Sequence, residues 1–256
     1  MRVIFFIIFL IYTCSSVENK TQESERVKQE TLFGRQIVKN FLIRYHLLHD
    51  RESTIALNSL VRKVAAFTSR NDLYYRAGIL DTDDVFAFSI PGGYILISRG
   101  MIKTWDSIES AEFVLAHELT HISLSHSFQP ENNNSFEKFL QAGLDPTGGI
   151  SVAANEFEKK WDTMLQETGR EPAQEFESDI SAGYILIELG CNPLSALSYL
   201  EKMEKLTKRT DWIQKTHPSF KDRVQVIQRE FKNKSRKTNS CIGKEDWEKL
   251  NANFKK

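Results

Sequence analysis

The pentapeptide HELTH at residues 117–121 constrains what this chain can fold into more than any other feature. The apolar spacing around it predicts a helix over Ser110–Ser125. On a helix, residues four positions apart lie on the same face, so His117 and His121 can bind a single Zn²⁺ together. Glu118 then points slightly aside, toward a water bound to that metal.

The same pentapeptide can also arise by chance on an amphipathic helix. Its neighbours argue against this alternative, because residues 111–116 are apolar at every position except Glu112. Two histidines and a glutamate in such a run are costly to bury unless they bind a ligand. A closed structural zinc site is a further alternative, but such sites use Cys and His, and neither Cys191 nor Cys241 is close to HELTH in the sequence.

A catalytic zinc needs a third protein ligand and an open fourth position. A helix predicted over Ala173–Leu189 contains the sequence EFESD, in which Glu175 and Asp179 are four positions apart and share one face. One of them can therefore reach the metal while the other hydrogen-bonds a ligand histidine. Glu177 lies on a different face and is the weaker candidate. A carboxylate pair on a helix is usually solvated, so this prediction depends on the presence of HELTH.

The hydrophobic pattern predicts a helical N-terminal part, a short β region and a helical C-terminal half. The predicted helices cover residues 31–49, 53–68, 110–125, 150–167, 173–189, 194–206 and 220–231, and the predicted strands cover residues 73–80, 85–90 and 94–98. Residues 129–135 form a polar loop between the predicted helices. Residues 232–256 are rich in Lys, and we expect them to be peripheral.

The N-terminus has the pattern of an export signal. Arg2 precedes the apolar run Val3–Tyr12, which small residues follow, and the run is too short to span a bilayer as a stable helix. We therefore expect residues 1–13 to be a signal peptide. A buried first strand or helix is the alternative, although the polar segment Val17–Glu30 offers it no partner.

The sequence IYTC at residues 11–14 resembles the lipobox of bacterial lipoproteins, in which the Cys becomes the acylated first residue. We therefore expect lipidation of Cys14, followed by a polar tether over residues 14–30. The two central residues of the motif differ from the usual small or Leu residues. Cleavage by an ordinary signal peptidase after Ser15 or Ser16 remains open.

The composition excludes several classes of protein. An apolar fraction of 41% is too high for a disordered chain, and 34 basic residues balanced by 34 acidic ones argue against a nucleic-acid partner. No later stretch is long enough to cross a membrane, since the best candidate, Val85–Ser98, is interrupted by Pro-Gly-Gly. An export compartment would permit Cys191 and Cys241 to pair, which the sequence leaves open.

Several short motifs follow one another along the chain. They are DTDDVFAF at residues 81–88, PGGYI at 91–95, Arg99-Gly100, LAHELTH at 115–121, EFESD at 175–179, and Thr216-His217-Pro218 with Arg223. Together they resemble metallopeptidase family 48 of the gluzincin clan, with HtpX and the CAAX prenyl protease, over roughly Gly34–Phe231. The chain lacks the transmembrane helices of the polytopic members, so it is most similar to the small envelope lipoprotein-type subgroup.

The resemblance implies an α+β fold, a mostly helical zincin-like metalloprotease domain with a small β-sheet beside the HExxH helix. That domain would cover residues 31–235, with a Lys-rich C-terminal tail over residues 236–256. One Zn²⁺ per chain is implied. The resemblance assigns the zinc ligands, the catalytic base and the residue that orients a ligand from behind. These are His117, His121 and Glu175 as ligands, Glu118 as the base and Asp179 as the orienting residue.

Three further positions are less settled. His217 is either a hydrogen-bond donor to the oxyanion, a plug of the open metal position, or a loop histidine before Pro218. His126 recurs in the family pattern, and we interpret it as a polar residue at a helix end rather than a ligand. The family commonly has Asn where this chain has Phe86, which puts a polar substrate contact there in doubt. The resemblance also suggests Tyr94–Ser98 as an edge strand that pairs with an extended substrate.

We therefore predict a zinc-dependent metalloendopeptidase that hydrolyses unfolded or misfolded cell-envelope proteins. Its partners would be polypeptide substrates and the membrane, through a lipid anchor, and not nucleic acid. It would face the periplasm of a bacterial envelope, or else be soluble in the periplasm or secreted. The alternative function is a chaperone-like assembly factor that binds clients on the same fold without cleaving them.

Overall fold

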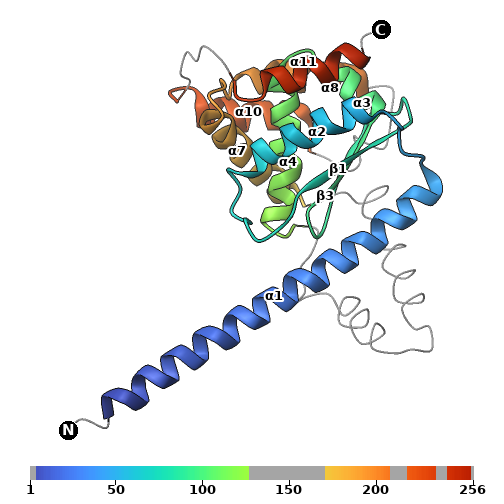
Figure 1. The fold of residues 1–256 in the computed structure, drawn as a ribbon. Coiled ribbons are helices and arrows are strands. Elements are labelled where there is room, and N and C mark those ends of the chain that lie inside the picture. Colours follow the sequence, from blue (N-terminus) through green and yellow to red (C-terminus); the bar gives the residue numbers. More distant parts are fainter. Residues whose placement is uncertain (1–3, 127–170, 208–217, 235–240, 255–256) are drawn as a thin grey trace.

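The computed structural model describes residues 4–126, 171–207, 218–234 and 241–254, with side chains from residue 23 onward (Figure 1). The predicted loop at 129–135 and the predicted helix at 150–167 lie outside the described residues. In chain order the elements are α1 (Ile4–Arg44), α2 (Arg51–Ala65), β1 (Arg76–Leu80), β2 (Ala87–Ile90), β3 (Tyr94–Ser98), α3 (Arg99–Thr104), α4 (Ile108–Ser123), α7 (Pro172–Glu188), α8 (Ser195–Thr207), α10 (Phe220–Phe231) and α11 (Lys244–Phe254). The predicted mostly helical α+β fold with a small sheet is confirmed.

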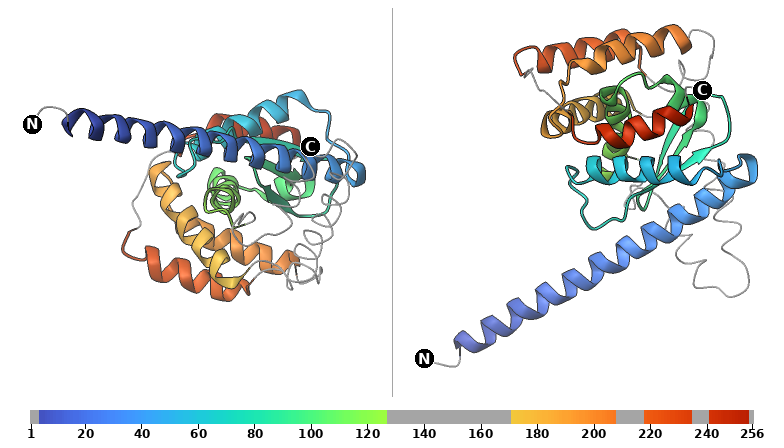
Figure 2. Two further views of the ribbon diagram at one scale, coloured as in Figure 1. Left: turned by 90° about the horizontal axis from the view of Figure 1, so that it is seen from below. Right: turned by 45° about the horizontal axis from the view of Figure 1, so that its top comes forward.

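Helix α4, which carries HELTH, lies inside the molecule. It begins where the Ser107 side chain accepts a hydrogen bond from the Ser110 backbone N–H at 3.2 Å, and it is buried along nearly its whole length. A helix that is apolar all round has to be covered on all sides. It packs against α7 on one side and against α2 and β2 on the other (Figures 1 and 2).

The three strands form one sheet in the order β1-β3-β2. Strand β3 is parallel to β1 and antiparallel to β2, with Ile97 beside Ile79 and Ile95 beside Ser89. The prediction that Tyr94–Ser98 is an edge strand is therefore wrong, because β3 is hydrogen-bonded on both sides. Among the described strands β2 is an edge, and it is the strand that packs against α4.

The tight turn between β2 and β3 is tied to α1. Gly92 and Gly93 have positive φ angles of 77° and 86°, which L side chains rarely adopt. The Gly92 N–H donates a hydrogen bond of 3.0 Å to the buried carboxylate of Glu30, which also accepts one from Arg70 at 2.9 Å. The turn is therefore held by a residue that we expected to lie in a polar tether.

The part of α1 that packs on the sheet is longer than predicted. Phe33, Ile37 and Phe41 are buried against Phe86 and Leu96 in a small second core cluster. Val27 also packs against the main core. The packed domain thus includes residues before 31, and the predicted tether over 14–30 is wrong at its C-terminal end because Glu30 is only 3% exposed.

The Lys-rich C-terminal segment is not peripheral. Within it, Lys244–Phe254 forms α11, which packs on α2 and buries Leu250 and Phe254. A disulfide between Cys191 and Cys241 ties the start of this segment to the end of α7. The predicted tail over 236–256 is therefore wrong for residues 241–254, where apolar side chains at helical spacing decide the packing despite the surrounding charges.

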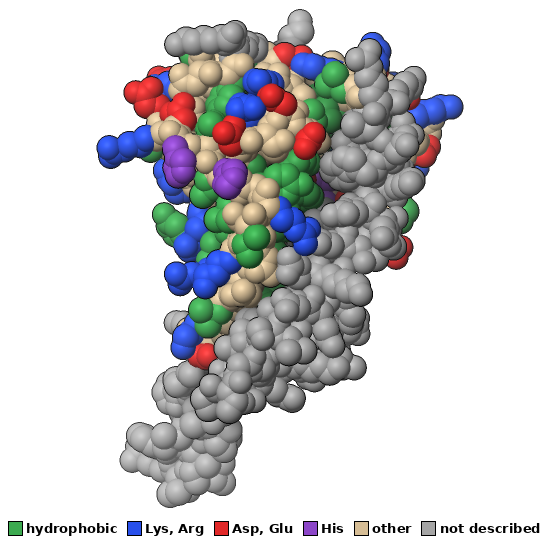
Figure 3. All heavy atoms as spheres, turned by 90° about the vertical axis from the view of Figure 1, so that its right-hand side faces the viewer, with side chains coloured by type: hydrophobic (Ala, Val, Ile, Leu, Met, Phe, Trp, Pro, Cys, Tyr) green, Lys and Arg blue, Asp and Glu red, His purple; other side chains and the backbone are tan. Residues whose placement is uncertain are grey.

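The surface agrees with the net charge of zero. On the face seen in Figure 3, Lys and Arg side chains are interspersed with Asp and Glu. In the described part of the chain, none of the helices combines the length and the apolar character that crossing a membrane requires.

Candidate metal centre

Helix α4 presents His117 and His121 on one face, as their spacing predicts. Both rings are buried, and the Nε2 atoms lie 3.1 Å apart. The ring planes are nearly perpendicular, at 81°, so the two nitrogens converge on one point and the rings do not stack. This geometry suits two ligands to one ion better than two independent core histidines.

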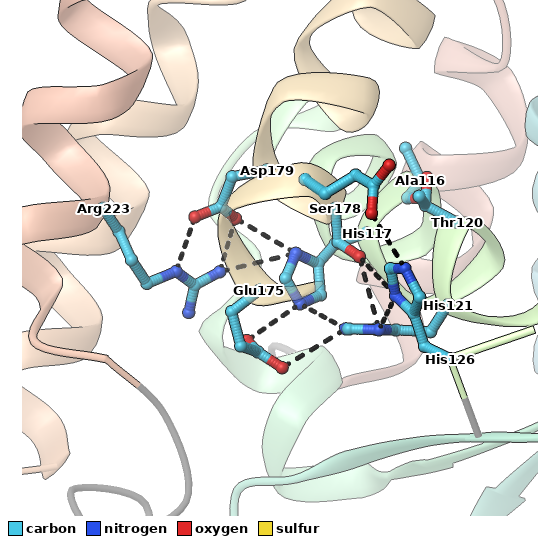
Figure 4. A network of polar contacts seen from close by, with 10 residues as sticks. Ala116, His117, Thr120, His121, His126, Glu175, Ser178, Asp179 and Arg223 are labelled. Carbon is cyan, nitrogen blue, oxygen red and sulfur yellow. Dashed lines mark hydrogen bonds and ion pairs between the residues drawn. The ribbon is translucent and has the colours of Figure 1, made fainter. Parts of the chain in front are cut away.

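Helix α7 brings the third group. Pro172 occupies its first turn, where the missing N–H costs no helical hydrogen bond, and Glu175 follows in that same turn. The Glu175 side chain is fully buried. Its Oε2 lies 3.4 Å from Nε2 of His117, and its Oε1 lies 3.4 Å from Nε2 of His121 (Figure 4).

These donor atoms fit a zinc ion. Zinc–nitrogen bonds of about 2.0–2.1 Å in a tetrahedron place neighbouring donor atoms about 3.3–3.4 Å apart. The separations of 3.1, 3.4 and 3.4 Å between the nitrogens and the carboxylate match that spacing. His117, His121 and Glu175 also form a group of potential ligand atoms that all lie within 4.8 Å of one another. The set supplies three protein ligands and leaves a fourth position for substrate or water.

Asp179 lies directly behind His117. Its Oδ1 accepts a hydrogen bond of 3.0 Å from Nδ1 of His117, which leaves Nε2 of that ring facing the other ligand atoms. Arg223 on α10 donates two hydrogen bonds to the same carboxylate, of 2.6 and 2.8 Å. Burial would raise the pKa of Asp179, but the charge and hydrogen bonds of Arg223 outweigh burial and hold it below its usual value. Asp179 is therefore ionised.

Arg223 had no predicted role beyond its place in the motif order. It lies on the apolar face of α10, one turn from Phe220 and one turn from Ile227, and it is buried. An arginine at an inward position of an amphipathic helix is rarely buried without a partner. That position was the signal in the sequence that could have identified it.

The carboxylates also shift the titration of His117. Burial alone would lower the pKa of this imidazole, but the hydrogen bond to Asp179 and the contact with Glu175 outweigh burial and raise its pKa to about 9. In the metal-free protein His117 is therefore protonated near neutrality. A metal ion and this proton compete for the same ring nitrogen.

Glu118 follows His117 on α4 and is not part of the group formed by His117, His121 and Glu175. Its side chain is only 6% exposed, and Oε2 has no hydrogen-bond partner among the described residues. A buried carboxylate oxygen without a partner is costly, so an occupant such as a water is expected there.

The remaining predicted positions have different outcomes. Glu177 is exposed on the other face of α7 and does not reach the ligands; it contacts His126 instead. Phe86, which stands where the family commonly has Asn, packs edge-on against Tyr45 in the small core cluster. This residue therefore serves the packing of the core. His217 lies outside the described residues. Cys14 lies on α1, in the part whose side chains are not described.

Comparisons with known proteins agree with this geometry. Residues 52–231 match Peptidase family M48. The mitochondrial metalloendopeptidase OMA1 of Bos taurus is 23% identical over 165 residues, which cover 59% of this chain and 31% of that protein. The mitochondrial metalloendopeptidase OMA1 of Schizosaccharomyces pombe is 25% identical over 185 residues, which cover 69% of this chain and 52% of that protein. The chain thus spans about a third to about half of the length of the curated relatives it matches.

Proposed function

Since the chain belongs to peptidase family M48, we propose that it is a zinc-dependent metalloendopeptidase with its active site on α4 and α7. The observation that carries the proposal is the convergence of three buried ligand atoms, from His117, His121 and Glu175, beside the buried carboxylate of Glu118. Three protein ligands and an adjacent carboxylate are the arrangement of a catalytic zinc and not of a closed structural one.

Zinc, when bound, lowers the pKa of a water and polarises a carbonyl group. The residues of the chain do the rest. Glu118 would accept a proton from the attacking water through Oε2, which has no hydrogen-bond partner among the described residues, and return it to the amine nitrogen that leaves. Asp179 keeps the proton of His117 on Nδ1, and Arg223 keeps Asp179 ionised. Burial of the whole group excludes bulk water and so strengthens these interactions.

His217 keeps the role proposed from the sequence. It would donate a hydrogen bond to the oxyanion, which is an interaction made mainly in the transition state. The His217→Ala variant should then lower kcat by about a hundredfold with its zinc content unchanged. If His217 instead plugs the open metal position, the same variant should raise activity.

The substrates would be extended, unfolded polypeptides. A peptide adds to a sheet at an outer strand, and β2 is an outer strand of the described sheet, so β2 replaces β3 as the proposed partner. Strand β2 packs against α4, the helix that carries two of the three proposed metal ligands. Pairing along a backbone selects extended chains more than particular side chains, and that suits removal of misfolded proteins.

The location remains part of the proposal. We propose export to a bacterial envelope with a lipid anchor at Cys14 facing the periplasm, and a soluble periplasmic or secreted form is the alternative. The two relatives are named as mitochondrial proteins. An organelle is therefore a second alternative, which the N-terminal sequence of the mature protein would decide.

The activity is tested on the zinc-loaded mature chain with unfolded casein. The wild type should cleave casein, lose activity with a chelator and regain it with zinc. The Glu118→Gln variant should lose about a hundredfold to ten-thousandfold in rate while it keeps its zinc, because only proton acceptance is removed. Glu109→Gln, on the same helix outside the site, is the matched control and should keep full activity.

Two results would contradict the proposal. One is cleavage by Glu118→Gln within threefold of the wild type. The other is a wild type that binds zinc and casein and prevents casein aggregation without cleaving it. That second result would favour the chaperone-like assembly factor.

A further inference from the structure

The two ligand histidines are supported from behind by different groups. Nδ1 of His117 faces the ionised Asp179. Nδ1 of His121 faces a different pair of groups. It lies 2.9 Å from Nδ1 of His126 and 3.3 Å from Oγ of Ser178 (Figure 4). His126 therefore occupies, for one ligand, the place that Asp179 occupies for the other.

The chain bends sharply to bring His126 there. On a continued helix, a residue five positions after His121 would lie about 140° away around the axis. Helix α4 instead ends at Ser123, and Ser125 adopts a positive φ of 56°, which is uncommon for a residue other than Gly. The backbone N–H of His126 then donates to the carbonyl of His121 at 2.9 Å. This turn places the two rings 5.0 Å apart at 67°.

The protons in this chain of contacts have one consistent arrangement. Nε2 of His121 converges with the other ligand atoms, so in a metal-bound neutral ring the proton is on Nδ1. Two ring nitrogens 2.9 Å apart form a hydrogen bond only if one accepts, so Nδ1 of His126 is the acceptor. The proton of His126 is then on Nε2, which lies 3.2 Å from Oε2 of Glu177. A carboxylate accepts a hydrogen bond from that N–H, so the contacts from His121 to His126 and from His126 to Glu177 each pair a donor with an acceptor.

We propose that His126 is a positioning residue for the metal, which it serves by accepting the Nδ1–H of His121, and that Glu177 holds His126 in the accepting tautomer. The inference rests on the proposed zinc site. It gives a role to a residue that the sequence suggested only as a polar helix end. It also gives a role to Glu177, which is 58% exposed and contacts His126.

Ser178 is the competing partner. Its hydroxyl lies 3.3 Å from Nδ1 of His121 and 3.4 Å from Nδ1 of His126, so it could accept from one ring or donate to the other. The distance between Nδ1 of His121 and Nδ1 of His126 is shorter, at 2.9 Å. Replacing Ser178 by Ala therefore separates the two contributions.

A matched pair of variants tests the role of His126 in the full mature chain. The amide of Asn reaches the position of Nδ1, so His126→Asn keeps an acceptor for His121. The amide of Gln reaches the position of Nε2, so His126→Gln keeps a group facing Glu177 but offers His121 no acceptor. Zinc affinity is measured by competition with a fluorescent chelator, and the Co²⁺-substituted proteins are compared by visible absorption. Circular dichroism of each variant checks that it folds.

We expect His126→Gln to bind zinc ten- to a hundredfold more weakly than the wild type, with a changed Co²⁺ spectrum. The zinc affinity of His126→Asn should stay within about threefold of the wild type. Ser178→Ala should weaken zinc binding less than His126→Gln does. A general packing role for His126 would not favour Asn over Gln, since the longer side chain fills the space better.

Three outcomes would overturn the inference. Equal zinc affinity of His126→Asn and His126→Gln would remove the role of the acceptor at Nδ1. If the Co²⁺ spectra of both variants showed one nitrogen ligand fewer than the spectrum of the wild type, His126 would be a direct ligand. A wild type that binds no zinc would contradict the proposed function as well, whereas the first two results would leave that function standing.

Discussion

Arg223 on α10 donates two hydrogen bonds, of 2.6 and 2.8 Å, to Asp179 on α7, and both side chains are buried. Asp179 in turn accepts the Nδ1–H of His117. The orientation of His117, a proposed metal ligand on α4, thus depends on a guanidinium on α10, and α7 supplies the carboxylate between them. This arrangement couples the packing of three helices to the geometry of the site.

Replacing Arg223 by Leu should destabilise the protein by about 3–5 kcal/mol, because the buried carboxylate of Asp179 loses two hydrogen bonds from a guanidinium and keeps only the contact with His117 among the described residues. Urea unfolding of the metal-free chain measures this. Arg229→Leu is the matched control on the same helix, since Arg229 is exposed, and it should change stability by no more than about 0.5 kcal/mol. Adding Asp179→Asn to Arg223→Leu should recover part of the loss. If Arg223→Leu and Arg229→Leu lowered the free energy of unfolding equally, the stabilising role of the Arg223–Asp179 pair would be refuted.

The sequence predicted most of the site because its chemistry depends on local spacing. Four residues separate His117 from His121 and Glu175 from Asp179, and helical periodicity alone puts each pair on one face. The same argument made Glu177 the weaker candidate for a ligand. The resemblance to metallopeptidase family 48 is confirmed by the match over residues 52–231. What remained open was which elements meet in space.

Contacts between distant segments were harder to predict. The strand order β1-β3-β2 does not follow from three short strands, although β3, which is apolar up to Ile97 and buried at all five positions, is typical of a central strand. The many charges of the C-terminal segment led us to expect a peripheral tail. The spacing of Trp247, Leu250 and Phe254, however, gives α11 one apolar face. The bend at Ser125, which turns His126 toward His121, could not be predicted from any periodic pattern in the sequence.

Glu175→Ala should abolish stoichiometric zinc binding, whereas Asp179→Ala should weaken it about ten- to a hundredfold. In the proposed site Glu175 would provide one of three protein bonds to the metal, while Asp179 would only fix the ring of His117. Metal content after gel filtration and chelator competition measure the two effects. If Glu177→Ala removed the zinc while Glu175→Ala retained it, the assignment of the third ligand would be wrong.

A lipid anchor at Cys14 predicts that the mature chain begins at that residue and sediments with membranes. The short apolar run before it and the polar segment after it are the basis for this expectation. Cys14→Ser should release the protein into the soluble fraction of the producing cells. Mass spectrometry of the mature protein is decisive, since an unmodified N-terminus at Ser16 or Val17 would exclude the anchor.

Glu112 should make the stability of the protein depend on pH. Its side chain is fully buried on α4, with Oε2 2.7 Å from Sγ of Cys191 and no hydrogen-bond partner for Oε1 in the described part of the chain. Burial, with a smaller contribution from the charge of Glu109, raises its pKa from 4.5 to about 9. Between these values the folded chain keeps a proton that the unfolded chain loses.

The stabilising contribution of protonated Glu112 is therefore complete below pH 4.5 and is lost as the pH rises toward 9. The free energy of unfolding should fall by up to about 1.4 kcal/mol per pH unit within this window. Glu112→Gln removes this slope, and the exposed Glu52→Gln should retain it. Urea unfolding at pH 5.5, 6.5 and 7.5 in zinc-loaded protein gives the slopes, and the difference from the wild type cancels the titration of the metal ligands. Parallel slopes for the wild type and Glu112→Gln would mean that Glu112 is ionised in the folded protein.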